Sequence, residues 1–255
     1  MKELLAVDLG VVEYGAAWEL QRRVVAARKA GNISDVLLLC EHPHVITLGR
    51  SGKMEHLCAP DEMLRQMGVS FFDTNRGGDM TYHGPGQLVG YPILNLGEIR
   101  RDVGWYVHGL EEAMIRATAE FGIASRRVPG RTGVWVDVAA AREEAEEVKE
   151  VQEIKDEEKL AAIGVHISRW VTSHGFAYNV STDLRYFDLI VPCGIVGKRA
   201  TSLEKLLKRN VGFSEVKPRI SGHLAELLGL RVRTCAREEL DAALREHDES
   251  AALTV

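Results

Sequence analysis

The strands that the sequence predicts for this 255-residue chain come in groups, with helices between the groups. Alternating or continuous apolar runs predict strands at residues 3–8, 35–42, 69–74, 87–94, 131–138, 160–171 and 174–182. Apolar residues at helical spacing predict helices over residues 17–27, 60–67, 103–114 and 213–227. This grouping favours the α+β class, a mixed β-sheet flanked by helices, over a strictly alternating parallel sheet.

We expect one domain over residues 1–255, since the sequence has neither a repeat nor a linker. A charged insertion at about 140–158 interrupts it: residues 142–158 hold nine acids and three bases and have no apolar periodicity. We expect this insertion to be an exposed helix or a mobile segment. From about residue 210 we expect a helical lobe. Thr201 with Glu204 fits a capping box that starts a helix, and Gly229 fits a helix stop.

Composition indicates an intracellular protein, which we expect in the cytoplasm. No apolar run reaches membrane-spanning length, and Glu3 and Asp8 fall where a signal peptide needs apolar residues. The four cysteines are scattered, as free thiols in a reducing compartment are. We therefore expect no membrane partner, and no nucleic-acid partner either.

Basic residues gather in two places that can receive an acidic macromolecule, although a solvated mixed surface accounts for them equally well. The net charge of -5 is local, because residues 142–158 alone carry -6 and the remainder sums to +1. The first cluster lies at 126–131. The second consists of Lys198, Arg199, Lys205, Lys208 and Arg209.

Glycine is unusually dense in the stretch RGGDMTYHGPGQLVGYPI, residues 76–93. Each glycine in a regular element costs roughly 0.5–1 kcal/mol relative to alanine. The density therefore predicts a close approach to this backbone. A strand over the Thr-Tyr-His part would place Thr81 and His83 on one face and Tyr82 on the other.

Cys193 has the setting of a nucleophile, between Pro192 and Gly194 on what we expect to be a sharply bent loop. A buried cysteine that packs as a small apolar side chain is the alternative. At an ordinary pKa near 8.5, only about 3% of a thiol is ionised at pH 7, so a nucleophile needs a cation or base nearby. The candidates are Lys159, His83, His174 and Lys198.

Lys159 is the most attractive candidate, because it stands where charged sequence turns into an apolar strand and a lysine becomes partly desolvated. A zinc site formed by Cys40, His42 and His44 at alternating positions is a weaker alternative. Pro43 interrupts that strand, and no second ligand group has a recognisable spacing. The sequence also lacks a phosphate-binding loop of the GxxxxGK[ST] type.

Five motifs occur in the order seen in the octanoyltransferases of lipoate biosynthesis, and the resemblance covers residues from about 37 to 230. They are EHPHVITLGRSG, RGGDMTYHGPGQLVGYPI, GVWV, KLAAIGVHISRWVTSHGFAYNV and PCG. The resemblance implies the catalytic fold shared by biotin and lipoate protein ligases. It also implies an acyltransferase that needs no ATP, metal or cofactor.

The activity implied is transfer of an octanoyl group from octanoyl-acyl carrier protein to a lysine of a lipoyl domain. The acceptors would be apo lipoyl domains of 2-oxoacid dehydrogenase complexes and the glycine cleavage H protein. By the same resemblance Cys193 carries the acyl thioester, Lys159 lowers the pKa of that cysteine, and His83 bridges the two. The implied acyl pocket consists of Arg76, Gly77, Gly78, Asp79, Met80, Thr81, Tyr82, His83, Ala162, Ile163, Gly164, Gly175, Phe176 and Ala177.

The sequence departs from the family pattern in two places. The acidic insertion is longer than expected, which makes Lys155 a competitor of Lys159. Tyr178 stands where the family usually has leucine, which leaves the acyl chain-length preference open. Three other functions remain as alternatives: an ATP-dependent lipoate or biotin protein ligase, a cysteine thioesterase, and a non-catalytic binding module.

Overall fold

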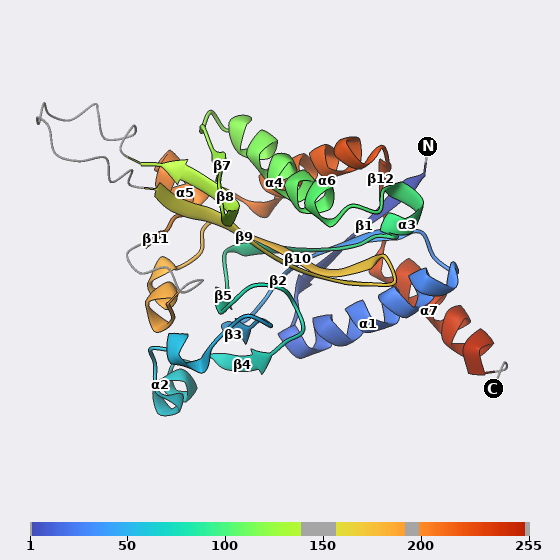
Figure 1. Ribbon diagram of the computed structural model, residues 1–255, viewed down its shortest axis with the longest axis horizontal. Helices are drawn as coiled ribbons and strands as arrows, with labels where there is room; N and C mark the ends of the chain where they lie inside the picture. The colour runs from blue at the N-terminus through green and yellow to red at the C-terminus, as the bar shows by residue number, and fades with distance from the viewer. Residues whose placement is uncertain (1, 139–156, 192–198, 253–255) are drawn as a thin grey trace, which may run out of the picture.

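A computed structural model describes residues 2–138, 157–191 and 199–252, and Figure 1 shows its layers. A mixed sheet of nine described strands forms the centre, in the order β12-β1-β2-β6-β10-β9-β8-β7, with β11 paired to β9. Its strands are β1 (Glu3–Val11), β2 (Asp35–Glu41), β6 (Gln87–Ile93), β7 (Arg126–Val128), β8 (Arg131–Asp137), β9 (Glu157–Ser168), β10 (Val171–Asn179), β11 (Arg199–Ala200) and β12 (Arg231–Thr234). The predicted α+β class is confirmed.

Helices cover both faces of this sheet (Figure 1). On one face, α1 (Tyr14–Ala30) and α7 (Arg237–Ala252) enclose one apolar cluster with β1, β2 and β6. On the other, α4 (Val103–Ala119) and α6 (Phe213–Leu228) enclose the largest cluster, called the main core below. The helices predicted at α1, α4 and α6 are confirmed, and the predicted stripes of α1 and α6 are buried or half-buried. In α4 the predicted stripe is buried at Leu110 and Met114, whereas Val103 in the first turn is 46% exposed.

A second sheet of three strands lies beside the first, in the order β4 (Ser70–Asp73), β3 (Val45–Leu48) and β5 (Thr81–His83). It packs with α2 (Asp61–Gln66) and the 3-10 helix η2 (Leu184–Leu189) around a separate apolar cluster. The 3-10 helix η1 (Met54–His56) has no buried residue and leads into Leu57, which packs against this cluster. The strand at 69–74 and the short helix near 60–67 are confirmed. The sequence did not predict β3, which occupies a stretch interpreted as loop.

Two short helices complete the fold, α3 (Leu96–Ile99) and α5 (Leu203–Leu207). The capping box predicted at Thr201 is wrong, since Ser202 caps α5 and accepts from the Lys205 amide at 3.3 Å. The reason is that the Thr201 amide extends the pairing of β11 and donates to the Lys159 carbonyl. Gly229 ends α6 in the left-handed conformation, as predicted.

Residues beyond 210 also contribute β12, which pairs in parallel with β1 in the main sheet. The sequence predicted no strand there. Glu157 and Glu158, placed in the charged insertion by the sequence, form the start of β9. The rest of that insertion from residue 139, with Lys155, lies outside the described residues, as do Cys193 and Lys198. None of the described helices is long and apolar enough to span a membrane.

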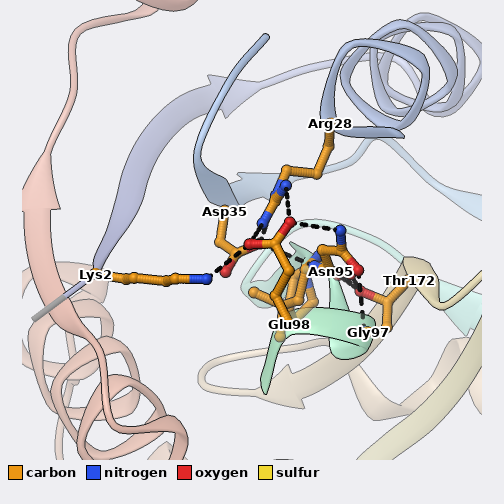
Figure 2. A network of polar contacts seen from close by, with 9 residues as sticks. Lys2, Arg28, Asp35, Asn95, Gly97, Glu98 and Thr172 are labelled. Carbon is orange, nitrogen blue, oxygen red and sulfur yellow. Dashed lines mark hydrogen bonds and ion pairs between the residues drawn. The ribbon is translucent and has the colours of Figure 1, made fainter. Parts of the chain in front are cut away.

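A partly buried ionic network joins α1, β2 and α3 at the end of the main sheet where β2 begins (Figure 2). Arg28 donates from Nε to Asp35 Oδ1 at 2.8 Å and from both terminal nitrogens to Glu98. Asp35 also accepts the Asn95 amide, and Lys2 reaches Glu98 from solvent. One guanidinium group therefore ties the end of α1 and the start of β2 to α3, which lies about 70 residues further along the chain.

Candidate active site

A cavity of about 480 Å³ opens between the glycine-rich segment, β9 and β10. Three of its walls come from the segments that the resemblance predicted: the glycine-rich segment, residues 162–164 and residues 175–177. All the predicted pocket residues except Tyr82 line it, and so does Lys159. The roles assigned to these residues remain predictions, and Cys193 itself lies outside the described residues.

Tyr82 points away from the cavity because side chains alternate along β5. Thr81 and His83 share one face of β5, as the strand interpretation predicted, and that face lines the cavity. Tyr82 is buried beneath the small sheet, stacks on Tyr186 at 5.1 Å and shares a hydrogen bond with His44 at 2.7 Å. Tyr82 therefore anchors β5 in the apolar cluster of the three-stranded sheet.

The backbone of residues 76–78 lies directly on β9, and glycines on the facing segments make room for it. The Gly77 amide donates to the Val165 carbonyl at 2.8 Å. A Cβ on Gly164 would lie 2.7 Å from the Gly77 oxygen, and one on Gly49 would lie 2.3 Å from the Gly78 oxygen. The close approach predicted from glycine density is therefore partly an approach of backbone to backbone.

His83 is buried and stays neutral at physiological pH. Its Nδ1 lies 2.7 Å from Gln87 Oε1, and the Gln87 amide nitrogen donates to Tyr82 O and Asn179 Oδ1. This network assigns the proton to Nδ1, so that Gln87 accepts it. Burial lowers the pKa of His83 to about 3, and the neighbouring His42 contributes to the shift. His83 can therefore act only as an uncharged group.

His174 lines the cavity at a distance from Lys159. It pairs with Val165, six residues along β9 from Lys159, or about 20 Å at the usual strand rise. It adopts a left-handed φ of 55°, its amide donates to Gln21 Oε1, and Nε2 lies 2.7 Å from Asn75 Oδ1. Burial lowers its pKa to about 3. Of the bases that the sequence suggested for Cys193, His174 therefore lies in a part of the cavity wall away from Lys159.

Lys159 stands directly opposite Trp135 in the ladder between β9 and β8. Its Nζ lies 5.1 Å from the Trp135 ring centroid, within the range of a cation–π contact. On its other side, Ala200 of β11 pairs with Lys159 and the Thr201 amide donates to its carbonyl. The chain thus returns beside Lys159 soon after the segment that carries Cys193.

The chain that leads into that segment is fastened to the loop that carries His56 and Leu57. The Val191 amide donates to the His56 carbonyl at 2.8 Å, and Ile190 bridges Leu57. His56 Nδ1 lies 2.6 Å from Asp79 Oδ2, and Asp79 lines the cavity. The described residues on either side of 192–198 are therefore both fixed beside the cavity.

Sequence reasoning missed part of the lining. The alternation of side chains in GVWV could have identified Trp135 as a lining residue. Val134 and Val136 face the main core, so Trp135 faces the cavity. The remaining wall comes from segments that only the tertiary fold brings together. The missed residues are Tyr14, Ser51, Val89, Tyr91, Val107, Gly130, Arg131, Thr132, Trp135, Val165 and His174. Of these, His174 had been named as a candidate base and Arg131 as part of a basic cluster, but neither as lining.

Tyr178 lies outside the cavity lining. It packs in the main core, where its hydroxyl lies 2.8 Å from Thr118 Oγ1 of α4. The tyrosine at this position therefore does not reshape the cavity wall.

The basic clusters are largely paired within the protein. Arg126 and Arg131 contact Glu157, and Arg127 binds acids of α4. In the second cluster, Lys205 pairs with Glu158 and Arg209 with Glu215. These pairs leave less uncompensated positive charge for an acidic partner than the sequence indicates.

The three residues considered for zinc have other contacts. His42 donates from Nδ1 to the Val12 carbonyl and accepts the Tyr91 hydroxyl at Nε2, 3.5 Å from Cys40 Sγ. His44 stacks on Tyr186 with ring centroids 4.1 Å apart. Over residues 2–138, 157–191 and 199–252, no three His, Cys, Asp or Glu side chains are grouped as metal ligands.

Comparison with known proteins agrees with the resemblance carried by the motifs. The family model of the lipoyl protein ligase A/B catalytic domain matches residues 13–225. The octanoyltransferase of Solibacter usitatus (strain Ellin6076) is 51% identical over 227 residues, which cover 89% of this chain and 94% of the relative. The chain belongs to the octanoyltransferase family. The octanoyltransferase of Roseiflexus sp. (strain RS-1) is 44% identical and covers 97% of this chain and 98% of its own.

Membership of the octanoyltransferase family makes the protein an acyltransferase of lipoate biosynthesis, as the motifs predicted. Solved structures support the fold. The bipartite lipoate protein ligase of Thermoplasma acidophilum aligns with a TM-score of 0.71 at 16% identity, over 96% of this chain and 92% of its own. A lipoate-protein ligase A bound with ATP aligns with a TM-score of 0.65 at 15% identity, over 96% and 93%. The predicted kinship with lipoate ligase folds is confirmed.

Proposed function

We propose that this octanoyltransferase moves the octanoyl group from octanoyl-acyl carrier protein to a lysine of an apo lipoyl domain, through a thioester on Cys193. The observation that supports this most is the cavity itself. Its walls are largely backbone and apolar side chains, as a saturated acyl chain requires, and Lys159 stands among them. Val191 and Arg199, the described residues that flank residues 192–198, are each fixed beside it.

The reaction has two transfers. The Cys193 thiolate attacks the carbonyl of the carrier thioester, the carbon–sulfur bond to the carrier breaks, and the carrier thiolate takes a proton. The lysine amine of the lipoyl domain then attacks octanoyl-Cys193, an amide forms, and the cysteine thiolate leaves. Lys159 stabilises the thiolate and relays the proton in both transfers. A thioester already carries the activation that amide formation needs, so ATP takes no part.

His83 and the glycine-rich segment hold the acyl chain in this scheme. A neutral His83 contributes hydrogen bonding at the wall without adding a charge beside the acyl chain. Gly77 and Gly78, which have no side chains, let the acyl chain lie against the backbone of this segment. No step uses a metal or a cofactor.

The acceptors that we propose are apo lipoyl domains of 2-oxoacid dehydrogenase complexes and the glycine cleavage H protein, with the reaction taking place in the cytoplasm. The structural relative from Thermoplasma acidophilum is described together with its E2 lipoyl domain. Transfer to a lysine of such a domain is the corresponding step here.

Intact-mass measurement tests this function. The protein is incubated with octanoyl-acyl carrier protein without ATP, before and after addition of apo lipoyl domain, with Cys193→Ser in parallel. We expect a single octanoyl adduct that requires Cys193 and then moves to the lipoyl-domain lysine.

Other outcomes separate the alternatives. Transfer that needs octanoate and ATP would identify a ligase. An adduct lost to water at the same rate with and without lipoyl domain would identify a thioesterase. Binding of the carrier with neither adduct nor transfer would identify a binding module.

A further inference from the structure

A β-bulge in β9 determines the face of the sheet on which the Lys159 side chain lies. Val134 pairs with Ala161 and Trp135 pairs with Lys159, so Leu160 is an extra residue on β9 opposite one step of β8. In a regular strand Lys159 and Ala161 would share a face. Instead Leu160 and Ala161 are both buried in the main core, and Lys159 lies on the cavity face. The bulge re-aims the lysine, as a one-residue shift of register does.

Gly133 of β8 is the glycine that the bulge requires. Its φ is 126°, in the region that favours glycine. A Cβ at this position would lie 2.4 Å from the Ala161 carbonyl oxygen and 2.7 Å from Lys159 Cε. The Lys159 side chain therefore passes over the space that a Cβ of residue 133 would fill.

Glu111 of α4 holds Gly133 in that conformation. Its Oε1 accepts the Gly133 amide at 2.9 Å, and its Oε2 accepts Nε of Arg127 at 3.1 Å. The Glu111 side chain is 5% exposed, so the carboxylate is buried and bonded through both oxygens. Because α4 packs on the main core, the Gly133 amide is tied to a rigid element rather than to the edge of the ladder.

We propose that Glu111 and Gly133 are positioning residues for Lys159: together they stabilise the bulge at Leu160 and keep the ammonium group on the cavity face, over Trp135. This inference rests on the proposed role of Lys159. A cation held there lowers the pKa of the nucleophilic thiol only while the bulge persists. Neither Glu111 nor Gly133 touches the substrate in this scheme.

The test is the pH profile of Cys193 alkylation by iodoacetamide, in a Cys58→Ser background because Cys58 is the exposed thiol among the described cysteines. Loss of the aligned lysine raises the pKa of the thiol toward its ordinary value near 8.5, at which only about 3% is ionised at pH 7, so the thiolate fraction at pH 7 falls. We expect Gly133→Ala and Glu111→Leu to slow alkylation at pH 7 at least fivefold and to move the profile to higher pH. Glu111→Gln keeps an oxygen for the Gly133 amide and should stay within about twofold of the parent.

Two controls make the outcome decisive. Gly122→Ala replaces another glycine of positive φ, 79°, where a Cβ meets nothing within 4 Å, and should leave the profile unchanged. Lys159→Met gives the full effect of losing the lysine. If Lys159→Met leaves alkylation and transfer unchanged, the role proposed for Lys159 fails and the positioning inference fails with it, while the transfer through Cys193 stands.

If Lys159→Met shifts the profile but a folded Glu111→Leu does not, the positioning inference is overturned while the function stands. The same conclusion follows if Glu111→Gln behaves like Glu111→Leu. Should Gly133→Ala fail to fold, the two Glu111 variants still decide the question.

Discussion

At the level of single residues, the shape of the cavity depends on glycines whose surroundings leave no room for a Cβ atom. Gly164 and Gly222 both lack a Cβ atom, but the space around Gly164 is filled and the space around Gly222 is open. At Gly164 a Cβ would meet the Gly77 oxygen at 2.7 Å and Arg76 Cδ at 3.2 Å, whereas at Gly222 in α6 it would meet nothing within 4 Å. Glycine is therefore required by packing at the first position and is only tolerated at the second.

We predict that Gly164→Ala destabilises the protein by about 1–3 kcal/mol, the usual cost of overpacking. It should also lower octanoyl loading at least tenfold, because the 76–78 segment must move off β9. Gly222→Ala should instead stabilise the protein by about 0.5–1 kcal/mol and leave loading unchanged. Urea unfolding and the intact-mass assay measure both effects. Equal behaviour of the two variants would contradict this account of the cavity.

At the scale of elements, the network in Figure 2 is the clearest case of one side chain fixing several segments. The Arg28 and Asp35 side chains are 6% and 2% exposed, whereas that of Lys2 is 59% exposed. Removing one member of a buried pair leaves the other charge uncompensated, which typically costs 3–5 kcal/mol. An exposed pair contributes about 0–1 kcal/mol.

Arg28→Met should accordingly lower the free energy of unfolding by about 3–5 kcal/mol, and Lys2→Met by less than about 1 kcal/mol. Urea unfolding at pH 7 measures both. A loss below about 1 kcal/mol for Arg28→Met would mean that α1, β2 and α3 are held by their apolar contacts alone.

Across the whole molecule, three buried histidines make stability depend on pH. Burial lowers the pKa of His42 to about 4 and those of His83 and His174 to about 3, from an ordinary value of 6.5. The unfolded chain therefore binds more protons than the folded one below about pH 6.5. Their contribution to stability is complete above that pH and is lost as the pH falls toward 4 and then 3.

We predict a stability plateau above about pH 7 and a decline below pH 6, with each histidine adding a slope of about 1.4 kcal/mol per pH unit. Urea unfolding at pH 8, 6 and 5 measures it. His42→Gln should remove about one third of this slope, while His108→Gln, at an exposed position on α4, should leave the slope unchanged. Equal stability at pH 8 and pH 5 would refute the assignment of these histidines as neutral.

The sequence by itself determined the features whose physical cause is local. The stripes on α1, α4 and α6 follow from the helical repeat, and the long strands follow from alternating or continuous apolar runs. The α+β class follows from their order along the chain. The motifs were specific enough to identify the family and to point to three walls of the cavity.

Tertiary structure decided the features that depend on contacts between distant segments. The short strands β11 and β12 carry little apolar signal and exist because a neighbouring strand satisfies their backbone groups. The pairing of His56 with Asp79, and of Gly164 with the 76–78 backbone, joins segments that no local pattern relates. Tertiary contacts also decided the face on which Lys159 lies, because regular alternation from Ala161 would point the Lys159 side chain into the main core. The bulge reverses that direction, and its partners on β8 and α4 lie tens of residues away in the sequence.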